Sequence, residues 1–205
     1  MLDLYETSFD ARWLTWAVRL QEKQDELFWD EKSGGYFAAS ATDPSIIFRT
    51  REPYDGAEPS PNSVAAMNLL RLAQITDRSD WKKKAEKTLG AFGNRLESTP
   101  EAMPQMAAAL DFSLSKPRQI IIAGALDAPD TRAMLGLVYR RYLPNKILLL
   151  ADGAAGQKQL SQWLPFVEGV TRQDGKATAY VCENYVCKLP SSDLRVVERL
   201  LDSKT

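Results

Sequence analysis

Asp55 and Glu58 are the residues of this chain whose types and spacing best fit acid–base chemistry. They lie in a polar segment, residues 49–63, that leads into an apolar helix-forming run. Two carboxylates a few ångströms apart can act as acid and base, or as base and stabiliser, on a sugar-like substrate. We therefore take both as candidate catalytic residues. The structural alternative is that Asp55 and Gly56 form a turn while Glu58 charges the N-terminal end of the next helix.

Three neighbouring side chains, Arg49, Tyr54 and Asn62, are candidate substrate-binding residues. An arginine can bind a carboxylate or phosphate through two parallel hydrogen bonds, and a tyrosine offers a stacking face with a hydroxyl. Asn62 stands at the start of the apolar run, where a buried polar group needs a partner. The competing interpretation is that these polar groups are consumed by pairing with one another inside the loop.

The chain contains no histidine, which excludes several common kinds of site. A Ser-His-Asp triad, a Cys-His pair or an imidazole metal site cannot form from it. Any acid–base chemistry must use carboxylates, Tyr, Lys or Cys. Residues 120–124 resemble the first strand of a nucleotide-binding fold but offer one glycine where the dinucleotide fingerprint needs three. We therefore expect neither a metal nor a cofactor.

Composition and charge limit the partners of the chain. Its net charge is −1, with 44% hydrophobic and 26% charged residues, so no global field favours nucleic acid or a membrane. No apolar run approaches the roughly 20 residues that a membrane span needs, and the N-terminus does not resemble a signal peptide. The sparse use of cysteine indicates a reducing compartment. These features predict a cytoplasmic protein that binds neither nucleic acid nor membranes.

The only cysteines are Cys182 and Cys187, with four residues between them. Redox pairs are usually closer in sequence, and a zinc site needs more ligands than two cysteines supply. Across a two-residue turn the pair is expected to sit diagonally, which is marginal for a disulfide. We predict buried structural cysteines, with a redox accessory role as the weaker alternative.

The sequence pattern of the first half of the chain predicts a series of helices. Ser8 is placed to cap a helix over residues 9–28, and residues 28–37 have the glycines and aromatics of a short hairpin. Ser60 followed by Pro61 predicts the start of a second helix. The apolar stripe expected for the first helix comprises Trp13, Trp16, Ala17, Leu20 and Leu27.

The helices after residue 60 differ in how apolar they are. The one beginning at Pro61 is apolar on nearly every side and is expected to be buried. The next, over residues 80–96, has one apolar stripe and many lysines, and a fourth over residues 105–113 is again apolar. Alternation of amphipathic and buried helices predicts two concentric layers of helical hairpins.

The second half, from residue 116, has an α/β pattern. We therefore divide the chain into residues 1–115, a helical domain, and residues 116–205, a small α/β segment. Two buried strands separated by a helix predict a right-handed βαβ unit. The expected elements are strands at 119–123 and 146–151, helices at 130–142, 156–164 and 192–201, and a β-type stretch at 176–187 with a turn at Glu183 and Asn184.

Two stretches carry a resemblance to a known family. Residues 48–49, 54–66 and 69–72, followed near the C-terminus by residues 177–184, resemble the spermatogenesis-associated, thioredoxin-domain-containing proteins. The resemblance implies an N-terminal thioredoxin-like domain followed by an (α/α)6 toroid, which is a six-hairpin glycosidase-like fold. This toroid is similar to that of N-acylglucosamine 2-epimerases. Residues 28–37 are similar to a hairpin of such sugar-handling toroids.

The resemblance implies that the chain is the C-terminal part of a longer protein. The implied fold is mainly α: a partial (α/α)6 toroid followed by a small α/β part. It implies a sugar-like small molecule in a pocket of the toroid, with the non-catalytic completion of a larger toroid as the alternative. The missing N-terminal portion, or a second copy of the chain, is then the expected partner. Any reaction that the resemblance implies is carbohydrate processing of an epimerase-like or isomerase-like kind. Because the epimerases depend on histidines, which this chain lacks, the resemblance supports a fold and a pocket more than a reaction.

Overall fold

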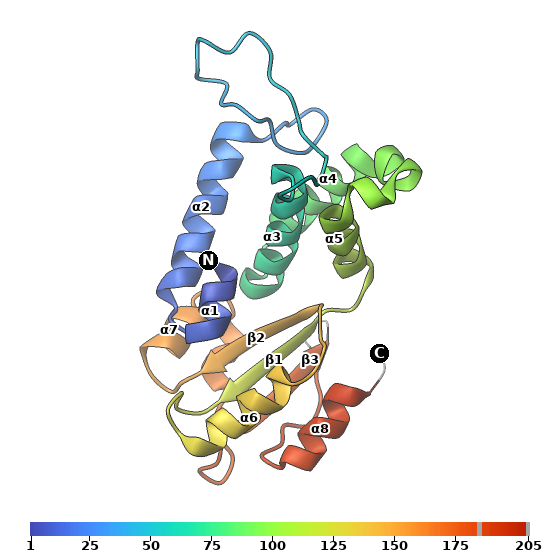
Figure 1. Cartoon of the computed structure of the whole chain (residues 1–205). Helices are drawn as coiled ribbons and strands as arrows, with labels where there is room; N and C mark the ends of the chain where they lie inside the picture. Colours follow the sequence, from blue (N-terminus) through green and yellow to red (C-terminus); the bar gives the residue numbers. More distant parts are fainter. Residues whose placement is uncertain (184–185, 204–205) are drawn as a thin grey trace. The chain divides into compact units, whose positions relative to one another are not determined.

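The computed structural model describes residues 1–183 and 186–203, which form two compact units. One unit comprises residues 15–115 and the other combines residues 1–14 with residues 116–205. The described residues contain eight α-helices and a four-stranded mixed sheet, so the chain is mainly α with a small α/β part (Figure 1). None of the helices in these ranges is long and apolar enough to cross a membrane.

The helical unit is organised around one buried helix. Its elements are most of α2 (Arg12–Phe28), α3 (Pro61–Thr76), α4 (Ser79–Ser98), the 3-10 turn η1 (Pro100–Ala102) and α5 (Pro104–Leu114). Helix α3 packs against both α4 and α5. The hydroxyl of Ser60 accepts the Ser63 N–H at 3.0 Å and Pro61 follows it, so the predicted start of this helix is confirmed.

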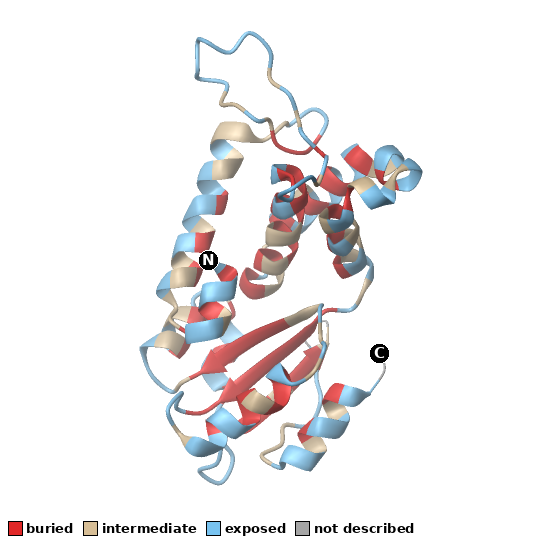
Figure 2. Ribbon diagram, in the orientation of Figure 1, coloured by how far each residue is buried: buried red, intermediate tan, exposed pale blue. Residues whose placement is uncertain are grey.

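The expected difference in burial between α3 and α4 is confirmed (Figure 2). Leu69 and Leu70 of α3 are buried, whereas Lys83 and Lys87 of α4 are exposed. Helix α4 buries one stripe, comprising Trp81, Ala85, Thr88, Leu89, Phe92 and Leu96. Helix α5 departs from expectation, because it buries only one side despite its apolar composition.

The predicted helix over residues 9–28 is present as α2 (Arg12–Phe28), but it begins three residues later than expected, and the proposed cap Ser8 belongs to a separate helix. A short helix, α1 (Leu2–Ser8), comes first, and its C-cap residue Phe9 has a left-handed backbone with φ 53°. The Asp10 carboxylate then accepts the Arg12 N–H at 3.0 Å, where α2 begins. The predicted apolar stripe was partly misplaced. Ala17 is buried as expected, but Trp16 and Leu20 are exposed, and the buried side also carries Leu14 and Gln21.

The α/β unit contains a four-stranded sheet in the order β2-β1-β3-β4. Strands β1 (Arg118–Ala123) and β2 (Lys146–Ala151) are parallel, as the predicted βαβ unit requires. Strand β3 (Thr178–Glu183) runs antiparallel to β1 and to β4 (Val186–Cys187). The remaining elements are α6 (Pro129–Tyr139), α7 (Ala155–Ser161), the 3-10 turn η2 (Pro165–Gly169) and α8 (Leu194–Asp202), of which α6 and α8 pack together beside the sheet (Figure 1).

Helix α1 belongs to the α/β unit, although residues 1–115 were expected to form one domain. The Tyr5 hydroxyl accepts the N–H of Leu150 on the edge strand β2 at 3.2 Å. Burial raises the pKa of the Tyr5 phenol above its ordinary value. Glu6 pairs with Lys146 at 3.1 Å, and its carbonyl accepts the Tyr139 hydroxyl at 2.6 Å. The helix therefore protects an edge whose free N–H groups would otherwise be open to another strand.

The sequence predicted two buried structural cysteines in a placement marginal for a disulfide, and this placement was wrong. Cys182 and Cys187 are directly opposed in the β3–β4 pair and form a disulfide. The sequence predicted a diagonal placement of the cysteines, which is the wrong strand register. Glu183 pairs with Val186, so the neighbouring Cys182 and Cys187 lie directly opposite each other. Cys182 is buried and Cys187 is exposed. Asn184, the second residue of the predicted turn at Glu183 and Asn184, lies outside the described residues.

Reducing the disulfide is expected to destabilise the α/β unit. The disulfide closes a short loop and so lowers the conformational entropy of the unfolded chain. This stabilises the folded state by about 2 kcal/mol. Chemical denaturation of the wild type with and without dithiothreitol measures the loss. The Cys187→Ser variant is the control and should show no response to the reductant. Equal responses of the two proteins would contradict a role for this bond.

Gly124, directly after β1, is expected to be intolerant of a side chain. A Cβ added there would lie 2.2 Å from the Thr131 hydroxyl oxygen on α6. We expect Gly124→Ala to lower the free energy of unfolding by about 1–3 kcal/mol through overpacking. The Thr131 hydroxyl is buried and has no hydrogen-bond partner among the described residues, so Thr131→Ala alone should cost within about 1 kcal/mol.

Denaturation of both single variants and the double variant completes this comparison. Because the two sites touch, Thr131→Ala should recover part of the loss caused by Gly124→Ala. Strictly additive losses would show that the close approach of Gly124 and Thr131 does not limit the packing of α6 on β1.

Candidate functional site

Asp55 uses both carboxylate oxygens to hold main-chain groups. Its Oδ1 accepts the Ser60 N–H at 2.7 Å, directly before α3. Its Oδ2 accepts the N–H groups of Gln105 at 2.8 Å and Met106 at 3.2 Å, in the first turn of α5. The Asp55 N–H in turn donates to the Ala102 carbonyl at 3.0 Å. The carboxylate therefore caps α5, where a negative charge is favoured, and ties it to the start of α3.

Asn62 is 1% exposed and binds two separate parts of the chain. Its Oδ1 accepts the Tyr36 N–H at 2.6 Å, and its Nδ2 donates to the Tyr36 carbonyl at 3.0 Å and the Glu52 carbonyl at 3.1 Å. Gly35 lies so close that an added Cβ would stand 2.9 Å from the Asn62 Oδ1. The side chain thus fastens the hairpin and the polar loop to α3.

The predicted hairpin is present and anchors two arginines. Trp29 and Tyr36 form an antiparallel bridge. The Arg49 guanidinium lies 3.9 Å from the centre of the Phe37 ring, a cation–π contact. Arg51 lies 3.4 Å from the Asp30 carboxylate and donates to the Gly34 carbonyl.

The environment of Asp30 favours its ionised form. Burial acts to raise the pKa of this carboxyl, but the N–H groups of Ser33 and Lys32, together with Arg51, outweigh it and lower the pKa. Arg51 of the polar loop is therefore paired with a carboxylate of the hairpin and, among the described residues, not with a carboxylate of the loop itself.

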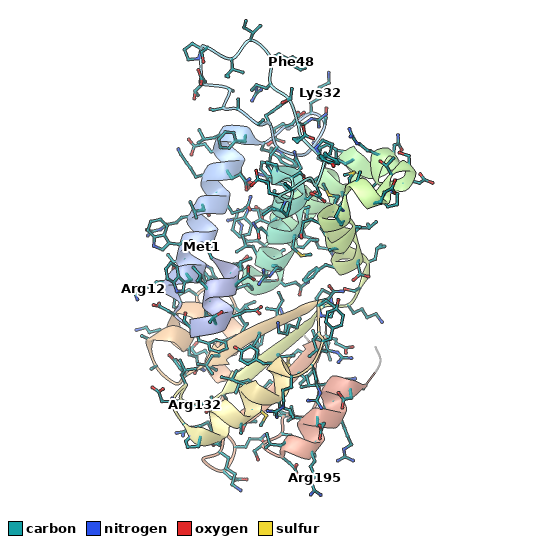
Figure 3. The ribbon with its side chains drawn as sticks, viewed as in Figure 1. Met1, Arg12, Lys32, Phe48, Arg132 and Arg195 are labelled. Carbon is teal, nitrogen blue, oxygen red and sulfur yellow. A yellow bond between two sulfur atoms is a disulfide. The ribbon has the colours of Figure 1, made fainter. Side chains whose placement is uncertain are left out.

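Tyr54 and Glu58 are exposed. The Tyr54 ring covers Gly56, where an added Cβ would approach it to 2.9 Å. Among the described contacts, none joins the carboxylates of Asp55 and Glu58. The structure thus brings Asp55 and Asn62 into the main-chain framework, stacks Arg49 on Phe37, and leaves Tyr54 and Glu58 toward solvent. The loop before them, residues 41–48, is exposed as well, with Phe48 projecting from it (Figures 2 and 3).

Asp25 on α2 is a part-buried carboxylate that was not among the predicted site residues. It accepts hydrogen bonds from the Tyr36 hydroxyl at 2.6 Å and from Gln21 at 2.9 Å. It also accepts the indole N–H of Trp81 at 3.1 Å and the ammonium of Lys84 at 2.8 Å. Burial raises the pKa of the Tyr36 phenol, and the hydrogen bond to this carboxylate raises it further.

A sequence signal for this cluster was present. Leu14, Ala17 and Gln21 follow one another at helical spacing, and Asp25 extends the same line by one turn. The larger tryptophan and leucine side chains of the other face concealed it. With donors from α2, α4 and the hairpin, Asp25 is equipped to hold these elements together. No group of three or more acidic or cysteine ligands suited to a metal occurs in the part of the chain that the structure describes.

Comparison with known proteins supports the resemblance noted from the sequence. The chain is similar to spermatogenesis-associated protein 20. It is 45% identical to the human protein over 202 residues and 44% identical to the mouse protein over the same length, each match covering 98% of the chain. An uncharacterised protein of Caenorhabditis elegans is 31% identical over 204 residues.

The chain spans about a quarter of the length of these relatives, 26% of the human protein and 27% of the nematode one. It thus corresponds to one region of these longer relatives. No family model matches the chain.

Removing the charge of Asp55 is expected to weaken the helical unit. An asparagine offers one acceptor oxygen in place of two, so Asp55→Asn should lower the free energy of unfolding by about 2 kcal/mol. Glu58→Gln is the matched control, and as an exposed substitution it should cost under about 0.5 kcal/mol. Urea denaturation of both variants measures the difference. Equal losses would contradict a capping role for Asp55.

Proposed function

We propose that this chain is a non-catalytic structural and interaction module of a longer protein. The proposal is supported by the hydrogen bonds of two predicted site residues. Asp55 accepts N–H groups at the starts of α3 and α5, and Asn62 accepts the N–H of Tyr36 in the hairpin. A carboxylate that accepts three N–H groups is not free to move a proton, and a buried amide with three partners is not free to bind a substrate.

An open apolar groove on the helical unit supports an interaction role. The groove lies between α4 and α5 and has a volume of about 650 Å³. Its apolar lining includes Leu89, Leu96, Ala107 and Leu110. Gly90 and Gly93 of α4 also line it, and an added Cβ at either would lie more than 4 Å from every atom of the described residues that could obstruct it. Helix α5 is therefore apolar on a side that no element of its own unit covers, which is typical of a contact surface.

The occupant that we propose is a helix from the remaining three quarters of the longer protein. The groove suits an apolar stripe, and its rim carries Glu86 and Glu97. An incoming helix with lysine or arginine beside its apolar stripe would match both features. In this proposal the helical unit completes a larger two-layer assembly, the (α/α)6 toroid that the family resemblance implies.

A sugar-like pocket is the second candidate. It is favoured by the exposure of Tyr54 and Glu58 beside Arg49 along one loop. In that case Glu58 is the acid–base candidate, Tyr54 stacks on the sugar and Asp55 only positions the loop. Thermal melts of the wild type and Glu58→Gln with a panel of sugars test this candidate. A sugar-dependent rise in Tm that Glu58→Gln abolishes supports it, and its absence argues for the structural module. A cytoplasmic location stays a prediction.

A charge placed in the groove is expected to weaken association. The isolated chain should self-associate, or bind the preceding region of the longer protein, because contiguous apolar surface favours burial. Ala107→Glu introduces a carboxylate among apolar side chains and should weaken the association at least about ten-fold, since a charge is costly to desolvate. Sedimentation velocity over a range of concentrations measures it.

Lys83→Glu, which changes a charge on the exposed face of α4, is the control for this experiment. It should leave the association unchanged. A wild-type chain that remains monomeric and shows no affinity for the preceding region would overturn the proposal.

A further inference from the structure

The α/β unit contains a cavity at the edge of its sheet where the two parallel strands end. Its volume is about 870 Å³, within the range of small-molecule sites. Gly124 follows β1 and Asp152 follows β2, and both line the cavity. Figure 1 shows the arrowheads of both strands at this edge. In open α/β sheets, ligands bind outside the carboxyl ends of the parallel strands, which is where this cavity lies.

Small residues leave the strand ends accessible. The lining at the two strand ends comprises Ala123, Gly124, Ala125, Ala151, Gly153 and Ala154. Gly153 has a positive φ of 74°, a conformation that other residues rarely adopt. A ligand can therefore approach the main chain closely, without a side chain that occupies the space.

The wall formed by α7 is held in place by its own hydrogen bonds. The Asp152 carboxylate accepts N–H groups from Ala154, Gly156 and Gln157. The Gln157 side chain, 9% exposed, accepts the Gly153 N–H at 2.9 Å and donates to the carbonyls of Val167 and Val170. These polar groups are satisfied within the protein, so they shape the cavity without competing for a ligand.

The charges that remain available in the cavity are mainly positive. Lys158 and Arg172 line it and are exposed, and no hydrogen bond or ion pair is seen for either side chain among the described residues. Asp130 lies near enough to Arg172 to feel its charge, but its carboxylate accepts the Ala177 and Thr131 N–H groups. Glu168 also lines the cavity, and no hydrogen bond or ion pair of its carboxylate is seen among the described residues.

We propose that this cavity binds a small molecule through an anionic oxygen group, a phosphate or a carboxylate. Lys158 and Arg172 would hold the anion, since charged donors form the strongest hydrogen bonds to such groups. The open main chain at Gly124 and Gly153 would receive the body of the ligand. Glu168 opposes the anion and accepts a hydrogen bond from a ligand hydroxyl or amine. This site is independent of the helical unit and of the function proposed for it.

The test uses the 205-residue chain with inorganic phosphate and with acetate, at matched ionic strength. Amide chemical shifts of Gly124 and Gly153 report binding, and their saturation gives the Kd. Lys158→Gln and Arg172→Gln should each weaken binding of the preferred anion by about ten-fold, the value of one charged hydrogen bond. Glu168→Gln should strengthen it. The preference between the two anions identifies the group that the natural ligand carries.

Arg195→Gln is the matched control, because Arg195 is an exposed cation on α8 of the same unit and lies outside the cavity lining (Figure 3). It should leave the Kd unchanged. Non-saturable shifts with both anions would overturn the proposal. An equal loss of affinity in Arg195→Gln and in the cavity variants would also overturn it, because it would mean that the anions respond only to overall charge.

Discussion

The helical unit depends on the Asn62 side chain, which binds the main chain of the hairpin and of the polar loop at once. Each of these segments is irregular, so its N–H and C=O groups lack the partners that a helix or sheet would provide. An amide that donates and accepts can replace those partners from one position on a buried helix. Gly35 must lie beside it for this contact to form. Asp55 extends the same arrangement to α5.

This arrangement explains how a loop rich in catalytic residue types can be structural. A buried main-chain group without a partner costs about 1–3 kcal/mol, so a loop that crosses the ends of several helices needs polar side chains. Asp, Asn and Ser meet that need with the same atoms that acid–base chemistry would use. In this unit the nearby Asp25 cluster follows the same principle, with four donors converging on one carboxylate.

The α/β unit uses its polar groups differently. Tyr5 and Glu6 protect the edge strand β2, and the disulfide secures the short strand β4 at the other edge. Both edge strands of the sheet are thus held, and small residues line a cavity at the carboxyl ends of its parallel strands. Two cations without a described partner remain there, in contrast to the satisfied polar groups of the helical unit. The distinction between framework and binding site therefore lies in which polar groups are already bonded.

The sequence by itself determined most of the regular elements, because the helix start at Ser60 and Pro61 and the buried strands β1 and β2 follow from local patterns. It also indicated which side of α4 is buried. Only the tertiary structure decided the partners of Asp55 and Asn62, the attachment of α1 to β2 and the pairing of Cys182 with Cys187. Periodicity reports the environment of a residue within its own element, whereas hydrogen-bond partners and strand register depend on contacts between residues distant in sequence.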